Sequence, residues 1–74
     1  MATATRQQEG VILRVNSRGF GYIGIVGHPD LWFHFNFCRD FEDDLGERMT
    51  GQRVLCSIQH GPRGPVAENV RPAD

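Results

Sequence analysis

Aromatic rings alternate with small or aliphatic residues in two short stretches of this 74-residue chain. The stretches are Arg18-Gly19-Phe20-Gly21-Tyr22-Ile23 and Leu31-Trp32-Phe33-His34-Phe35. In an extended chain successive side chains point to opposite faces, so Phe20 and Tyr22 share one face. By the same rule Trp32 and His34 share one face of the second stretch. If the two stretches pair as neighbouring strands, these side chains form one row of flat rings, and exposed rings of this kind stack on unpaired nucleotide bases.

The opposite faces of the same stretches already provide a hydrophobic core. The predicted core consists of Ile12, Ile23, Ile25, Leu31, Phe33, Val54 and Ile58. The alternative is that the row of rings is ordinary sheet packing, because cross-strand aromatic pairs stabilise a sheet by up to about 1 kcal/mol each. Since the core is complete without the rings, we interpret the row as a binding surface.

Catalytic and metal-binding patterns are missing from the sequence. His34 has no charged partner within sequence reach, and no nucleophile stands at a characteristic spacing from a base. Cys38 and Cys56 do not form a paired ligand motif, and zinc would need His28, His34 or His60 from scattered positions. A disulfide or a metal site is the alternative to reduced, buried cysteine. We therefore expect no enzyme, no cofactor, no metal and no small-molecule substrate.

Charge is segregated along the chain, although the net charge is only −1. Residues 39–48 hold five of the nine acidic residues, and the remainder of the chain holds six arginines against four acids. Every basic residue is Arg, whose planar guanidinium both pairs with phosphate and stacks on bases. A few such charges would suffice to bind a nucleic acid. The alternative is that the arginines only reflect the base composition of the genome.

Five short strands are predicted to position the rings. They span residues 10–15, 19–26, 31–35, 52–60 and 66–71, where β-branched and aromatic residues lie between turn residues. Residues 36–50 have no clean period and indicate a long connection with room for one helical turn. Val54, Cys56 and Ile58 should point inward from the fourth strand. With no long helix to cover its apolar face, such a sheet is expected to close on itself as a single small barrel.

Two further expectations concern the glycines and the start of the chain. Glycines in the second strand would help it coil, and would leave room for a base beside the rings. The polar start lacks a secretion signal, and no apolar run approaches the roughly 20 residues that span a bilayer. We therefore expect a soluble, cytoplasmic protein without membrane contacts, and a monomer.

The two ring-bearing stretches resemble the ribonucleoprotein motifs of the cold shock domain family. Residues 18–23 resemble Lys-Gly-Phe-Gly-Phe-Ile, and residues 31–35 resemble Val-Phe-Val-His-Phe. Gly51-Gln52 also matches, as do residues 61–70, which resemble Gly-Asn-Arg-Gly-Pro-Gln-Ala-Ala-Asn-Val. The resemblance covers residues 9–71, with residues 1–8 as a flexible segment and 72–74 as a tail. It implies an all-β fold, a small five-stranded antiparallel barrel of the OB type, which binds single-stranded RNA or DNA.

The resemblance also implies roles for individual residues. Side chains implied to stack on bases, or to meet them edge-on, are Phe20, Tyr22, Trp32, His34 and Phe35. Arg18 and Arg63 would meet phosphates or base edges, and Asp30 would accept a hydrogen bond from a base edge. Arg14 and Phe41 are further candidates. Arg14 stands where the family has a Trp, and Phe41 matches a loop Phe. The alternation of side chains supports only Phe20, Tyr22, Trp32 and His34 independently.

The first predicted strand departs from the family pattern. Val11-Ile12-Leu13-Arg14-Val15-Asn16 replaces Lys-Val-Lys-Trp-Phe-Asn, so one ring and both lysines are lost, and Val66 replaces a Gln.

The function expected is that of a nucleic-acid chaperone, which binds unpaired bases and so shifts RNA structure toward the melted state without ATP. The alternative is a protein-interaction barrel whose rings bind an extended or Pro-rich peptide.

Overall fold

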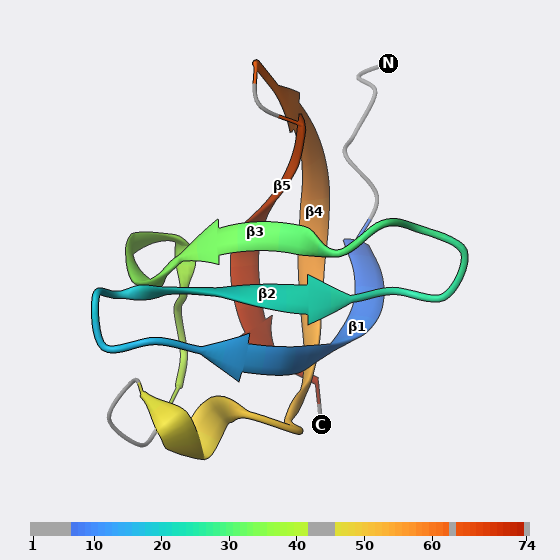
Figure 1. The fold of residues 1–74 in the computed structure, drawn as a ribbon. Helices are drawn as coiled ribbons and strands as arrows, with labels where there is room; N and C mark the ends of the chain where they lie inside the picture. The colour runs from blue at the N-terminus through green and yellow to red at the C-terminus, as the bar shows by residue number, and fades with distance from the viewer. Residues whose placement is uncertain (1–6, 42–45, 63, 74) are drawn as a thin grey trace.

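Five strands close into a barrel in the computed structural model, which describes residues 7–41, 46–62 and 64–73 (Figure 1). The elements are β1 (Gln7–Val15), β2 (Phe20–Gly24), β3 (Leu31–His34), η1 (Phe35–Phe37), η2 (Glu47–Met49), β4 (Arg53–Gly61) and β5 (Gly64–Pro72). The strand order around the barrel is β1-β2-β3-β5-β4. In Figure 1, β1, β2 and β3 lie side by side across the front, and β4 and β5 cross steeply behind them. The predicted all-β barrel is confirmed.

One seam of the barrel is parallel. β3 pairs with β5 in the parallel sense, with Trp32 opposite Val66, whereas the other pairings are antiparallel. The expected antiparallel barrel is thus found with one parallel seam. Strand directions cannot alternate all the way round a ring that holds an odd number of strands, so a closed barrel of five must contain a parallel pair.

The ends of the barrel strands extend beyond the expected domain boundaries. β1 begins at Gln7, which pairs with Ser57 and accepts a hydrogen bond from the Arg71 guanidinium at 2.7 Å. Residues 7 and 8 therefore belong to the sheet and not to the segment expected to be flexible. β5 likewise runs to Pro72, which pairs with Val54. In both cases backbone pairing with the long strand β4 recruits residues whose types alone do not indicate a strand.

The core contains six of the seven predicted residues, all but Ile58, together with Met49, Cys56, Ala67 and Val70. Its buried side chains are Ile12, Ile23, Ile25, Leu31, Phe33, Met49, Val54, Cys56, Ala67 and Val70. Ile58 is half-buried against this core. The pairing of β4 with β5 shifts between Leu55 and Ser57, so Cys56 and Ser57 are both buried and the alternation that predicted Ile58 is interrupted. Asn69, with a φ of 53°, adopts the left-handed conformation at this bulge.

The turn between β1 and β2 forms where the sequence predicts it. The Asn16 side-chain oxygen accepts hydrogen bonds from the backbone N–H groups of Arg18 at 3.0 Å and Phe20 at 3.4 Å. Gly19 has a φ of 100°, a conformation that glycine adopts without steric cost. This turn brings the rings of β2 back alongside β1.

Among the described residues, no helix is long and apolar enough to cross a membrane.

Candidate nucleic-acid interface

Four ring-bearing side chains of β2 and β3 lie on the outer face of the barrel, namely Phe20, Tyr22, Trp32 and His34. The pairing of the two strands places Phe20 opposite His34 and Tyr22 opposite Trp32. All four of these side chains are half-buried, whereas the residues between them on the strands, Gly21 and Phe33, are buried. The alternation predicted from the sequence is therefore correct, because the inward positions fill the core and leave the rings outside.

The outward rings contact one another and hold a defined geometry. The ring centres of Phe20 and Trp32 are 5.9 Å apart with their planes inclined by 36°. Tyr22 meets Phe20 edge-on at 6.4 Å, and His34 lies 6.1 Å from Trp32. These distances fall in the range in which aromatic pairs attract each other. The rings are therefore arranged before any ligand arrives, which lowers the conformational entropy lost on binding.

A fifth ring, that of Phe37, joins this group from η1. Its centre lies 6.3 Å from Trp32 and 6.3 Å from His34, with the planes inclined by 81° and 65°. His34 caps η1 through Nδ1, which accepts a hydrogen bond from the Asn36 N–H at 3.0 Å. In a 3-10 turn residues three apart lie on the same side, which places Phe37 beside His34. We call Phe20, Tyr22, Trp32, His34 and Phe37 the ring surface.

Sequence reasoning missed Phe37 because it continued the strand period of two through Phe35. The strand ends at His34, and Phe35 turns inward, where its ring lies 6.2 Å from that of Phe33. Phe41 is also half-buried against the core. The structure therefore brings neither Phe35 nor Phe41 into the ring surface. The signal that could have identified Phe37 is its spacing of three residues from His34 at the end of an extended stretch.

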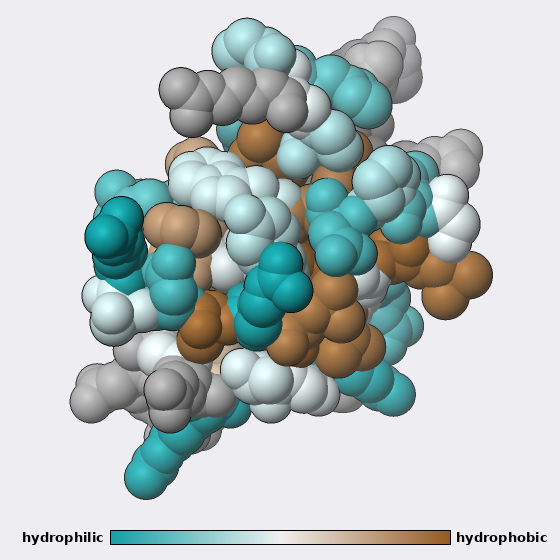
Figure 2. Space-filling view, in the orientation of Figure 1, coloured by the Kyte–Doolittle hydropathy of each residue, from teal (hydrophilic) through white to brown (hydrophobic). Residues whose placement is uncertain are grey.

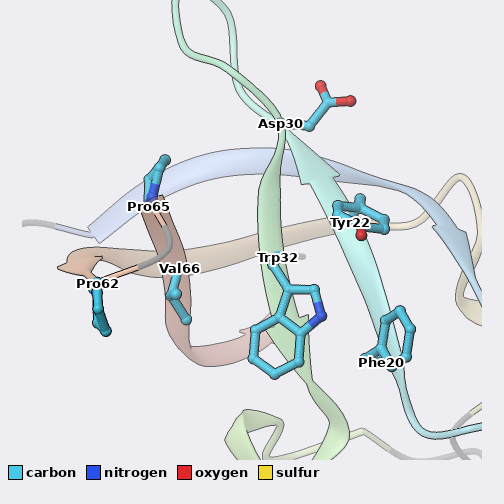
Figure 3. Close-up of a pocket in the computed structure, with 8 residues that line it drawn as sticks. Phe20, Tyr22, Asp30, Trp32, Pro62, Pro65 and Val66 are labelled. Carbon is cyan, nitrogen blue, oxygen red and sulfur yellow. The ribbon is translucent and has the colours of Figure 1, made fainter.

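A groove of about 670 Å³ adjoins the ring surface. It is lined by Phe20, Tyr22, Asp30, Trp32, Gly61, Pro62, Pro65 and Val66. Figure 3 shows Trp32 between the rings of β2 on one side and the β4–β5 hairpin, which carries Val66, on the other. The exposed carboxylate of Asp30 stands at the start of β3, at the rim of the groove. A flat group with apolar faces and an N–H at its edge fits this arrangement.

One arginine lies against the ring surface, and a second stands in the turn that leads into β2. Arg14 pairs with Tyr22 across β1 and β2, and its guanidinium carbon lies 4.7 Å from the centre of the Tyr22 ring. Arg18 is exposed in the turn that follows β1. Within the described part of the chain neither has a carboxylate partner, since the ion pair found there joins Arg53 to Glu9 at 3.2 Å. Arg63 lies outside the described residues.

The glycine at the centre of β2 has a different role from the one expected. Gly21 points into the barrel, where an added Cβ would lie 2.4 Å from the Arg14 carbonyl oxygen and 3.0 Å from the Phe33 ring. It therefore permits close packing of the barrel and does not leave space for a base beside the rings.

Pale and brown surface gathers on the face that β1, β2 and β3 turn to the viewer in Figure 2, with strongly hydrophilic side chains among and around it.

The cysteines do not form a reactive site in the described structure. Burial raises the pKa of the Cys38 and Cys56 thiols to about 11, so both stay protonated at neutral pH. Over residues 7–41, 46–62 and 64–73, no group of three or more His, Cys, Asp or Glu side chains could hold a metal ion. The ring surface and its groove are therefore the features of this part of the chain with evident binding chemistry.

Several curated proteins are similar to the chain in sequence. It is 38% identical over 55 residues to the major cold shock protein CspA of Bacillus cereus, covering 74% of this chain and 79% of that protein. It is 33% identical over 64 residues to the cold shock protein CspA of Staphylococcus aureus, covering 85% and 94%. The cold shock-like protein CspB of Escherichia coli is 39% identical over 54 residues, covering 72% and 73%.

The fold is similar to that of a solved structure as well. The chain drosophila Unr CSD456 matches 97% of this chain with a TM-score of 0.77 at 18% sequence identity, and the match spans 29% of that longer chain. At this identity the likeness concerns the fold alone. No protein-family model matches the chain.

Proposed function

Since this chain belongs to the cold shock protein family, we propose that it binds single-stranded RNA or DNA by stacking unpaired bases on the ring surface. The observation that carries the proposal is the outward, mutually supporting arrangement of Phe20, Tyr22, Trp32 and His34. A base in a duplex is already stacked on both sides, so these rings would select unpaired strands.

Stacking supplies most of the binding free energy in this proposal. Each base stacked on an aromatic side chain contributes about 1 to 3 kcal/mol, so three or four positions contribute roughly 3 to 12 kcal/mol before ordering costs. Arg18 and Arg63 would meet phosphates or base edges, with Arg14 as a further candidate. Asp30 would accept a hydrogen bond from a base N–H at the rim of the groove. Phe35 and Phe41 would act indirectly, since they pack against the core and outside the ring surface.

A chaperone activity follows from selective binding. A protein that binds only the open form of a hairpin shifts the equilibrium toward melting by mass action, and this needs neither ATP nor a catalytic group. We therefore propose a binding role in place of catalysis. A single chain carries the whole ring surface, so a monomer suffices, and we place its activity in the cytoplasm.

Fluorescence titration tests the proposal directly, because Trp32 is the only tryptophan and belongs to the ring surface. Oligo-U and oligo-dT should quench Trp32 with saturation, whereas a matched duplex should not. A hairpin with a fluorophore and quencher at its ends should open as protein is added. Saturable binding of an extended or Pro-rich peptide, with no response to either oligonucleotide, would instead support the protein-interaction barrel.

A further inference from the structure

We propose that Phe37 supplies an additional base-stacking position, so that the ring surface accepts one nucleotide more than the rings of β2 and β3 alone. This inference rests on the proposed single-strand binding. Phe37 comes from η1, outside the paired strands, yet its centre lies 6.3 Å from both Trp32 and His34. Since Trp32 and His34 are themselves 6.1 Å apart, the three ring centres form a nearly equilateral triangle, and Phe37 widens the ring surface beside these two rings, outside the lining of the groove.

The Phe37 ring is held in place from two sides. Its inner side packs against the core, and it remains half-buried, so part of the ring reaches the surface. The turn that carries it is fixed by the hydrogen bond from the Asn36 N–H to Nδ1 of His34 and by that from the Cys38 N–H to the Phe35 carbonyl at 3.0 Å. A ring fixed in this way binds a base with little loss of side-chain entropy.

The inclination of Phe37 determines how a strand would lie on it. Its plane is inclined by 81° to Trp32 and by 65° to His34. A base stacked on Phe37 would therefore stand steeply to the bases before it, and the strand would have to turn after His34. Such a turn breaks the stacking of neighbouring bases on each other, which costs least for uracil and thymine. We infer that this position favours a pyrimidine at a flexible step.

A ladder of oligo-U lengthened by one nucleotide at a time tests this inference with the full chain. For wild type we expect the last nucleotide that fits the ring surface to tighten binding by roughly five- to hundredfold. Phe37→Leu keeps the apolar packing but removes the ring, and should lack this last step while binding the shortest oligonucleotides as wild type does. Phe37→Tyr should restore the step. Val26→Ala is the matched control, because the Val26 side chain is 99% exposed and belongs neither to the core nor to the ring surface.

The outcomes separate the two proposals. If wild type binds no oligonucleotide, the proposed function itself fails. If wild type binds and Phe37→Leu follows it over the whole ladder, Phe37 is not a stacking position. If Phe37→Leu weakens every length equally, Phe37 only supports Trp32 and His34, and the inference is again overturned. Thermal unfolding of each variant shows whether it is folded, and if Phe37→Leu does not fold, Phe37→Met takes its place in the comparison with Phe37→Tyr.

Discussion

Arg14 and Tyr22 face each other across β1 and β2, with the guanidinium carbon 4.7 Å from the centre of the ring. A cation at this distance from an aromatic face is attracted by about 0.5 to 1 kcal/mol when the site is exposed. The contact holds a positive charge at one border of the ring surface. The sequence pattern puts a Trp of the family at this position, and here a planar cation stands in its place. The border thus combines a flat surface with a charge that can meet a phosphate.

The first prediction separates the charge of Arg14 from its planarity. Arg14→Gln should make the log–log salt slope of oligo-dT binding shallower by about 0.7, because one phosphate contact on a single strand is lost. Arg14→Lys should keep the slope but bind more weakly, since an ammonium group cannot stack as a guanidinium does. Titrations at several salt concentrations measure both quantities. An unchanged slope in Arg14→Gln would show that Arg14 meets no phosphate.

The second prediction concerns the salt dependence of the wild-type chain. If two or three arginines meet phosphates, the slope on single strands should lie between about −1.4 and −2.1. Stacking on the rings, which is insensitive to salt, supplies the remainder of the binding free energy. A slope steeper than about −4 would mean that phosphate contacts dominate, and would contradict a mechanism based on the rings.

The third prediction concerns the centre of the ring surface, where Phe20 and Trp32 lie 5.9 Å apart. Phe20→Ala and Trp32→Ala should each weaken oligonucleotide binding by more than tenfold, because each removes a stacking position worth about 1 to 3 kcal/mol and loosens its neighbour. Anisotropy of a labelled oligonucleotide measures both variants, including the one that lacks tryptophan. Circular dichroism should show an intact barrel, and Val26→Ala should bind as wild type does. Unchanged affinity in a folded Trp32→Ala would remove the ring surface from the binding site.

The part of this surface that alternation could predict ends where the strands end. Phe20 and Tyr22 lie on the outer face as predicted, because a period of two separates outward rings from inward Gly21 and Ile23. Phe37 breaks this rule: a period of two would point it inward with Phe33 and Phe35, but the backbone leaves the extended conformation after His34 and enters η1, which brings the Phe37 ring to Trp32 and His34. An alternation with a period of two cannot predict the end of the strand, because that end depends on a cap made by the His34 side chain itself.

The barrel, like the ring surface, could be predicted only in part. A closed barrel was predictable from short strands without a long helix, but the register within it was not. Cys56 and Ser57 are buried together where β5 forms a bulge at Asn69, and this depends on the pairing between β4 and β5. Met49 enters the core from η2, in a connection that has no clean period. Contacts that depend on tertiary pairing leave little trace in local alternation.

The fourth prediction tests the inward role of Gly21. Gly21→Ala should destabilise the fold by about 1 to 3 kcal/mol, because the new Cβ would meet the Arg14 carbonyl oxygen at 2.4 Å and backbone must move. Gly61→Ala is the matched control, since its Cβ would have nothing nearer than 3.5 Å. Urea unfolding measures both. Equal stability of Gly21→Ala and wild type would show that the barrel at this point is looser than the structure indicates.

The fifth prediction concerns the alkaline limit of stability. Burial raises the pKa of Cys56 from an ordinary 9.0 to about 11, so the folded state keeps the proton that the unfolded state loses first. The resulting stabilisation is complete below pH 9 and is lost as the pH rises toward 11, because ionisation then favours the unfolded chain. Cys56→Ala should therefore lose less unfolding free energy than wild type between about pH 8.5 and about pH 10.5. Cys38→Ala should behave in the same way, because burial raises the pKa of this half-buried thiol to about 11 as well. Because other groups titrate in the same range, the decisive quantity is the difference between wild type and Cys56→Ala, measured by urea unfolding at each pH, and a constant difference would refute the assignment.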